Sequence, residues 1–159
     1  MKIEFERKFL LKNQSWRTSV VRTRRLRDGL IAESENGTVR VRVEEPQAWL
    51  TVKGLQIGIG RLEAEYEIPL ADAERMLREI CGPNVVEKMR HLIPYDGLTW
   101  EVDVYTGRLE GISCAEIELA SAHCPVRLPP WVGKEVTGDP HYGKWELLRS
   151  RLATQVPAK

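Results

Sequence analysis

Polar and apolar residues alternate with a period of two along much of the chain, which is the pattern of a β-strand with one buried face. Residues 2–10 place Ile3, Phe5 and Phe9 on one face and charged side chains on the other. Similar runs follow at residues 38–45, 49–53, 62–68, 86–90, 100–105 and 115–119, with a weaker one at 24–32. Asn36-Gly37 and Asp96-Gly97 have the composition of tight hairpin turns. The pattern therefore predicts an antiparallel sheet or barrel.

Two segments have the spacing of amphipathic helices instead. Residues 71–81 carry an apolar stripe between Pro69 and Gly82-Pro83, and residues 144–153 carry a second one. Residues 124–139 contain three prolines and are predicted to form a loop. With no linker or repeat in view, we expect one domain over residues 1–153 and a frayed tail over 154–159.

The charge balance narrows the class of protein. The 159 residues include 24 Lys and Arg and 23 Asp and Glu, for a formal net charge of +1. This balance disfavours nucleic acid and membrane surfaces as partners. No apolar run approaches the ~18 residues of a membrane span, and the three cysteines form no CxxC pair. These features predict a cytoplasmic protein with reduced thiols, and they do not fix its oligomeric state.

Like-charged residues recur two positions apart on the polar faces of the predicted strands. The acidic pairs are Glu4/Glu6, Glu65/Glu67, Glu101/Asp103 and Glu116/Glu118, and the basic pairs are Arg40/Arg42 and Lys88/Arg90. Each strand by itself fits an antiparallel sheet with one solvated face. However, neighbours at i and i+2 lie about 7 Å apart on one side of a strand, and like charges held close are destabilising. Six such pairs favour faces turned inward around a cavity, with the apolar faces covered outside by helices.

A cavity of this kind needs compensating ligands, because burying an unpaired charge costs several kcal/mol. Divalent cations prefer the oxygen ligands that grouped carboxylates offer, and phosphate oxygens pair with arginine and lysine. A metal-bound polyphosphate satisfies both kinds of wall. Phosphoryl transfer requires mainly positioning and charge neutralisation. Since no nucleophilic side chain stands out, the pattern predicts attack by a water that a carboxylate or a second metal orients.

The segment Glu4-Phe-Glu6-Arg-Lys8 resembles the ExExK signature of the CYTH, or triphosphate tunnel metalloenzyme, family. The likeness continues in order over residues 4–142, which makes it specific although ExExK alone is a weak pattern. Its further segments are Arg40-Val-Arg42, Thr51-Val-Lys53, Glu65-Tyr-Glu67, Glu87-Lys-Met-Arg90, Glu101-Val-Asp103-Val-Tyr105, Ala115-Glu116-Ile-Glu118 and residues 130–142.

The resemblance implies a mainly β, α+β fold: a closed eight-stranded antiparallel tunnel with a charged interior and helices packed outside. It implies an enzyme of the short bacterial type that uses Mg²⁺ or Mn²⁺ to hydrolyse inorganic triphosphate to pyrophosphate and phosphate. Adenylate cyclase or organic triphosphatase activity is the alternative, although no base-recognition pocket is evident. A non-catalytic polyphosphate-binding module is the third interpretation, but it would tolerate loss of the acidic residues, which are all present.

The resemblance also carries over residue roles. The implied metal ligands are Glu4, Glu6, Glu65, Glu67, Glu116 and Glu118. The implied triphosphate ligands are Lys8, Arg40, Arg42, Lys53, Lys88 and Arg90, and the implied catalytic residues are Glu67, Glu118, Lys88 and Arg90. Glu63 has the same parity as Glu65 but falls outside the aligned motif, so its role is left open.

Two features depart from the family pattern or lie outside it. Where many members read Gln-Gly-Tyr-Leu, this chain reads Asp28-Gly-Leu30-Ile. The missing tyrosine hydroxyl puts a contact near the reacting phosphate in question. A basic run of Arg22, Arg24, Arg25 and Arg27 fits either a tunnel mouth or a solvated edge equally well.

Overall fold

The computed structural model of the protein describes residues 1–154, and most of them belong to a single antiparallel sheet. Its strands are β1 (Lys2–Leu11), β2 (Arg22–Ser34), β3 (Gly37–Glu44), β4 (Gln47–Ile57), β5 (Gly60–Glu67), β6 (Val85–Tyr95), β7 (Leu98–Thr106), β8 (Ser113–Leu119) and β9 (Val132–Glu135). The predicted strand at 24–32 is longer at both ends, and the other predicted strands lie where the alternation placed them.

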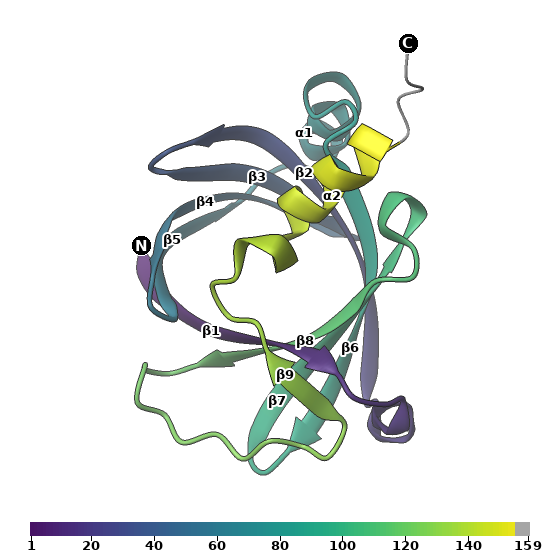
Figure 1. Ribbon diagram of the computed structural model, residues 1–159. Helices are drawn as coiled ribbons and strands as arrows, with labels where there is room; N and C mark the ends of the chain where they lie inside the picture. Colours follow the sequence, from purple (N-terminus) through teal and green to yellow (C-terminus); the bar gives the residue numbers. More distant parts are fainter. Residues whose placement is uncertain (155–159) are drawn as a thin grey trace.

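The sheet closes into a ring of eight strands, in the order β5-β4-β3-β2-β6-β7-β8-β1, because β1 also pairs with β5. Ile3 lies opposite Leu62 across this closing seam. Figure 1 looks into the opening of the ring. The prediction of a closed eight-stranded antiparallel tunnel is confirmed.

The ninth strand corrects the predicted loop at 124–139. β9 pairs with the end of β1, where Phe9 faces Glu135 and Leu11 faces Val132. A strand of four residues is too short to show alternation, and its partner lies more than 120 residues earlier in the chain. Local sequence could not reveal this pairing.

The two tight turns differ in detail from prediction. Asp96 and Gly97 both have positive φ, 50° and 76°, as a two-residue hairpin of this composition requires. In the other hairpin the turn residues are Glu35 and Asn36, and Gly37 begins β3 with a φ of 150°. A Cβ atom at Gly37 would collide with the carbonyl oxygen of Lys53, so this position requires glycine for close approach of β4.

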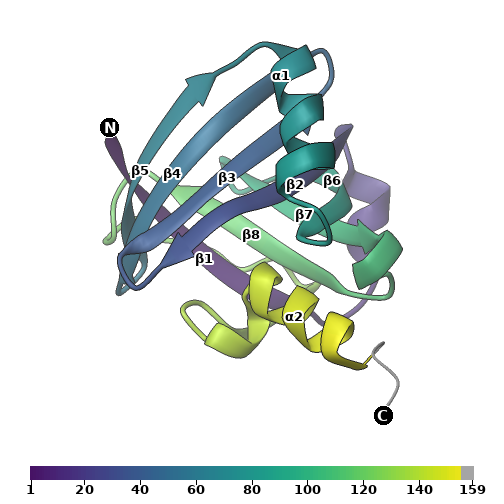
Figure 2. The same cartoon turned by 90° about the horizontal axis from the view of Figure 1, so that it is seen from above.

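The first helix packs outside the ring, as expected. Helix α1 (Leu70–Arg75) continues into a π-helical turn, η2 (Met76–Ile80), which together match the predicted stripe at 71–81. Ala73 and Leu77 pack on Val41 and Val43 from the outer face of β3. Figure 2 shows this helix lying on strands β2 and β3.

The last helix has a different position. Helix α2 (Lys144–Thr154) follows the short 3-10 turn η4 (Pro140–Tyr142) and lies across one end of the ring rather than along its outside (Figures 1 and 2). Leu148 on this helix packs with Val86, Tyr105 and Leu109. Thr154, expected in a frayed tail, is the last residue of α2, and the rest of that predicted tail, 155–159, lies outside the described residues.

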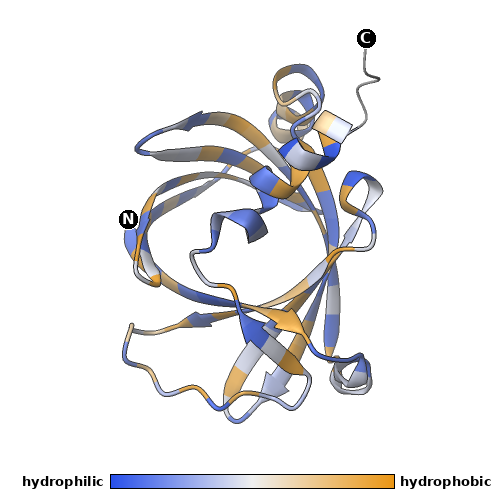
Figure 3. Ribbon diagram, in the orientation of Figure 1, coloured by the Kyte–Doolittle hydropathy of each residue, from blue (hydrophilic) through white to orange (hydrophobic). Residues whose placement is uncertain are grey.

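The outer apolar surface is covered by more than helices. The largest cluster includes Phe9, Trp100 and Ile117 of the sheet, together with Trp16 of the 3-10 helix η1 (Ser15–Ser19) and Trp131 beside β9. Figure 3 shows these apolar segments gathered below the ring opening. On the outer side of β1 and β5, Ile3, Leu62 and Tyr66 are exposed, which differs from the expectation that helices cover the apolar faces. Within residues 1–154, neither helix is long and apolar enough to cross a membrane.

Candidate active site

The ring encloses a cavity of about 520 Å³ that is lined mainly by charged side chains. Alternation dictates this lining, because every second residue of each strand faces inward. Most of the cationic lining residues of the strands lie on the adjacent strands β4, β3, β2 and β6: Lys53, Arg40, Arg42, Arg24, Lys88 and Arg90. Most of the acidic ones lie on β7, β8, β1 and β5: Glu101, Glu116, Glu118, Glu4, Glu6, Glu63 and Glu65. We call these groups the basic half and the acidic half. The exceptions are Lys2, Lys8 and Arg61 on β1 and β5, and Glu33 and Glu44 on β2 and β3.

The carboxylate of Glu4 links the two halves. It accepts hydrogen bonds from Lys53 Nζ at 2.8 Å and from Arg61 Nε at 2.8 Å. Burial raises the pKa of Glu4, but the charges of Lys53 and Arg61 outweigh it and lower the pKa to about 2. Glu4 is therefore ionised over the whole physiological pH range.

Glu6 has the opposite environment. The nearest counter-ion to it among the described residues is the guanidinium of Arg61, with Nη2 3.7 Å from Oε1. Burial, followed by repulsion from Glu116 and Glu4, raises the pKa of Glu6 to about 7. Glu6 lies beside other carboxylates, and its one ion pair is too long for a hydrogen bond, so a divalent cation would neutralise the excess negative charge here.

The deepest ion cluster joins β6 to β7 and β8. Arg90 donates to both oxygens of Asp103 at 2.7 Å and to Glu116 at 2.8 Å, and it also pairs with Glu101. Lys88 pairs with the same Asp103 carboxylate. Burial lowers the pKa of Arg90, but Asp103 and the other carboxylates raise it well above its usual value. These two cations are therefore held rigidly before any substrate binds.

The acidic half fits a hard metal ion. Its donors are carboxylate oxygens from four neighbouring strands, and the one ion pair of Glu6 among the described residues, with Arg61, is long at 3.7 Å. One further group, Asp103, Cys114 and Glu116, offers three ligand atoms within 4.8 Å of one another. Because Lys88 and Arg90 already neutralise Asp103, we regard Glu6 and its neighbours Glu4, Glu116 and Glu118 as the more suitable position.

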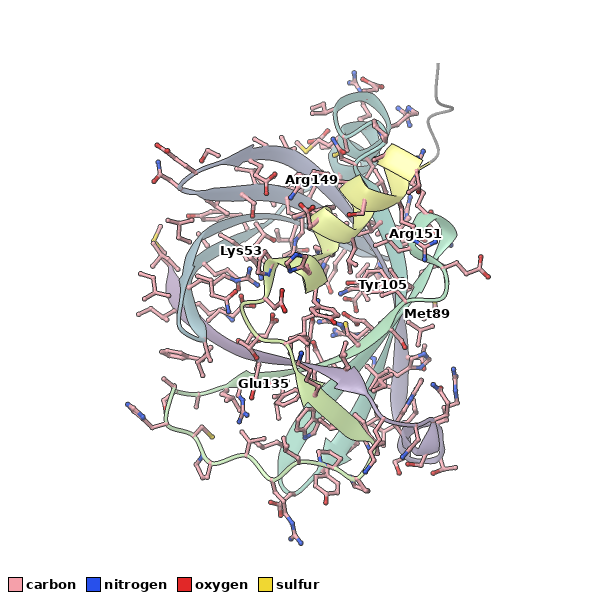
Figure 4. The ribbon with its side chains drawn as sticks, viewed as in Figure 1. Lys53, Met89, Tyr105, Glu135, Arg149 and Arg151 are labelled. Atoms are coloured by element: carbon pink, nitrogen blue, oxygen red, sulfur yellow. The ribbon has the colours of Figure 1, made fainter. Side chains whose placement is uncertain are left out.

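Most of the residues assigned from the sequence meet in this cavity. Those that line it are Glu4, Glu6, Lys8, Arg40, Arg42, Lys53, Glu65, Lys88, Arg90, Glu116 and Glu118. Glu118 lies at an open end, since its side chain is 54% exposed and pairs with Lys2 at 2.8 Å. Figure 4 shows charged side chains, including labelled Lys53, directed into the ring.

Glu67 is not brought into the cavity. It is the last residue of β5, lies opposite Trp49 in the register and is exposed. Thr51 and Arg40 contact Glu65 instead, at 2.9 and 3.5 Å. The roles of Glu67 as catalytic residue and metal ligand stay predictions, and its position does not favour them.

Glu63 takes the interior position on this strand. Its side chain is 6% exposed and pairs with Lys53 at 2.8 Å and with Lys2 at 3.5 Å. The alternation in β5 contains the signal, because Glu63 and Glu65 share a face. The family motif aligns with Glu65 and Glu67 instead, which left the role of Glu63 open.

Three further charged residues of the site had weak or no sequence signal. Asp28 is buried behind the basic half, and Arg24 pairs with Glu44 at 3.2 Å and Glu101 at 3.7 Å while lining the cavity. Arg25 of the same basic run instead pairs with Glu87 in an exposed position. Within this run, Arg24 therefore lies in the tunnel and Arg25 at a solvated edge. Lys144 enters from α2, and only the tertiary fold brings it to the cavity.

The unusual environment of Glu6 predicts how stability changes with pH. Its pKa is about 7 in the folded protein against an ordinary 4.5, so the folded state binds a proton that the unfolded state has lost. Stability from this group is therefore complete below pH 4.5 and decreases as the pH rises to about 7. We expect Glu6→Gln to remove this decrease.

The measurement is the thermal midpoint of both proteins, without metal, from pH 4.5 to 8. Glu4, Asp28 and Glu116 have lowered pKa values and titrate below this window in the folded protein. Their contribution is common to both proteins, so the difference between the two curves isolates Glu6. Parallel curves would show that Glu6 titrates normally.

Comparisons with known proteins agree with this geometry. A family model described as the CYTH domain matches residues 2–143. An inorganic triphosphatase of Acetivibrio thermocellus is 41% identical over 147 residues, covering 92% of this chain and 94% of that protein. An inorganic triphosphatase of Nitrosomonas europaea is 32% identical over 144 residues, covering 87% of this chain and 92% of that protein. A crystal structure of an inorganic triphosphatase superposes with a TM-score of 0.64 at 30% identity, covering 98% of this chain and 100% of the other.

Proposed function

The chain belongs to the CYTH domain family, and from that premise we propose that it is a metal-dependent hydrolase that cleaves inorganic triphosphate to pyrophosphate and phosphate. The single observation that carries the proposal is that one cavity holds most of its strand cations on one half and most of its strand carboxylates on the other. Two relatives that share most of the chain's length carry the name inorganic triphosphatase. The cytoplasmic location stays a prediction.

In this proposal the two halves have separate tasks. The side chains of the basic half, with Lys8, bind the phosphate oxygens and hold the triphosphate in one orientation. The residues that would hold Mg²⁺ or Mn²⁺ are Glu4, Glu6, Glu116 and Glu118, assisted by Glu63 and Glu65. The metal, when bound, neutralises phosphate oxygens and acidifies a coordinated water.

The bond changes require only water as co-reactant. Oxygen of the water forms a bond to the terminal phosphorus, and the bond from that phosphorus to the bridging oxygen breaks. Pyrophosphate is the leaving group, and we assign the acceptance of the water's proton to Glu118 Oε. Glu118 suits this task because it lines the cavity and pairs only with the exposed Lys2 among the described residues. Arg90 and Lys88, fixed on Asp103, stabilise the charge that develops on the phosphate oxygens.

The test uses the full chain with tripolyphosphate, ATP or thiamine triphosphate, each with Mg²⁺ or Mn²⁺. We expect one orthophosphate and one pyrophosphate per tripolyphosphate, no turnover after chelation of the metal, and recovery when metal is restored. The organic triphosphates are expected to react more slowly. Cyclic AMP production, or faster turnover of an organic triphosphate, would replace this proposal with the alternative activity. Tight binding of tripolyphosphate without hydrolysis under either metal would indicate a binding module.

A further inference from the structure

Asp28 is a buried carboxylate for which the proposed reaction has no use. It lies on β2 behind the basic half and is 1% exposed. Arg42 donates to both of its oxygens, with Nε at 2.7 Å from Oδ1 and Nη2 at 2.9 Å from Oδ2. Lys144 pairs with Oδ2, and Arg40 Nη1 lies 3.8 Å from the same oxygen. One carboxylate therefore gathers three cations, all of which line the cavity.

The three cations would repel one another without that carboxylate. Burial and then Arg42 lower the pKa of Arg40, and burial also lowers the pKa of Lys144 well below its usual value. Asp28 opposes both effects, and its own pKa is held well below normal by Arg42, Lys144 and Arg40 despite complete burial. The cluster is thus arranged around Asp28.

Lys144 also connects this cluster to the helix that covers one end of the ring. It is the first residue of α2, and both Lys144 and Trp145 line the cavity. Two ion pairs join β2 to α2: the largely buried pair of Asp28 and Lys144, with side chains 1% and 16% exposed, and the exposed pair of Glu33 and Arg149 at 2.7 Å. Figures 1 and 2 show α2 lying across this end.

A buried pair contributes far more to such a contact than an exposed one. Exposed ion pairs are worth about 0–1 kcal/mol because water and salt screen them, whereas removing one partner of a buried pair leaves an uncompensated charge. Of the two ion pairs, that of Asp28 and Lys144 therefore contributes more to the position of α2, in addition to the packing of Leu148 on the sheet.

We propose that Asp28 is a positioning residue that docks α2 over the cavity through Lys144 and holds Lys144 and Arg42 together as one site for phosphate oxygens. The expected effect of Asp28 on catalysis rests on the proposed function, whereas its expected effect on the docking of α2 does not. Asp28 acts through the cations that it holds, and does not itself line the cavity.

The test compares Asp28→Asn, Lys144→Met and the double variant with the matched control Glu33→Gln, which breaks the exposed link between the same two elements. Hydrogen exchange of residues 144–154, followed by mass spectrometry without substrate, reports the docking of α2. Steady-state hydrolysis of tripolyphosphate with Mg²⁺ then gives KM and kcat separately.

We expect Asp28→Asn and Lys144→Met each to speed exchange in α2 and to raise KM about tenfold, the size of one charge-assisted hydrogen bond, with kcat changing less. The double variant should resemble the worse single variant, because both break the same link. Glu33→Gln should resemble the wild type in exchange and KM.

Unchanged exchange and KM in Lys144→Met would overturn the inference, as would an equal effect of Glu33→Gln. If Asp28→Asn does not fold, Lys144→Met still decides, because Arg42 continues to pair with Asp28 in that variant. If the wild type does not hydrolyse tripolyphosphate, the proposed function fails while the exchange experiment still judges the docking of α2.

Discussion

Replacing Arg90 with methionine is expected to reduce the free energy of unfolding by about 3–5 kcal/mol, the typical cost of leaving buried charges without their partner. Arg90 binds Asp103 through two hydrogen bonds and also pairs with Glu116 and Glu101. Without it, three carboxylates keep one close cation each: Lys88 at Asp103, Lys8 at Glu116 and Arg24 at Glu101. For a chain of this length, the loss corresponds to a thermal midpoint roughly 10 °C lower.

The same substitution is expected to lower kcat/KM for tripolyphosphate at least about 100-fold, because a fixed cation facing the reacting phosphate is lost. Activity should be measured at a temperature at which circular dichroism shows the variant folded. Arg25→Met is the matched control, since Arg25 likewise joins β6 to a neighbouring strand, β2, through Glu87, but in an exposed pair. We expect that control to change stability by about 1 kcal/mol or less. A variant at Arg90 with wild-type stability and activity would contradict the described ion cluster.

Glu63→Gln is expected to lower activity about 100-fold, whereas Glu67→Gln should change it less than about threefold. The magnitude follows from losing one charged group of a preorganised site. Glu63 is buried in the acidic half beside Lys53, while Glu67 is exposed at the end of β5. Both substitutions remove one negative charge and preserve shape, so each controls for the other.

The decisive measurement is kcat over a titration of Mg²⁺ for both variants. If Glu63 assists metal binding, Glu63→Gln should also need a higher Mg²⁺ concentration for half-maximal activity. The reverse order, with Glu67→Gln inactive and Glu63→Gln active, would restore the assignment made from the motif and show that β5 presents its other end to the substrate.

Several parts of the structure could be predicted because they depend on local pattern. Period-two alternation and turn composition located eight strands, and paired like charges showed that their polar faces turn inward. Repeated pairs of like charges are unfavourable on a solvated sheet face, so these pairs indicated an enclosed cavity. The two helices were also visible, since a stripe of apolar residues with clear ends is a local feature.

Other parts depended on contacts between distant segments. β9 is four residues long and is stabilised by pairing with β1. Its own residues show no strand pattern, so the sequence predicts a loop there. Asp28 stands in a basic run, and nothing in its neighbourhood indicates that Arg42 and Lys144 will surround it. Similarly, an exposed and an interior glutamate on β5 have the same local pattern, and only the ring's geometry separates Glu63 from Glu67.

The amino-acid sequence alone determined the strand pattern, the inward-facing charges and the kind of ligand that could neutralise them, because alternation and charge are properties of each strand. Only the tertiary structure decided which carboxylates meet which cations, and that α2 covers one end of the ring. Those outcomes depend on ring closure and on the docking of α2, which bring together groups more than a hundred residues apart, as with Asp28 and Lys144.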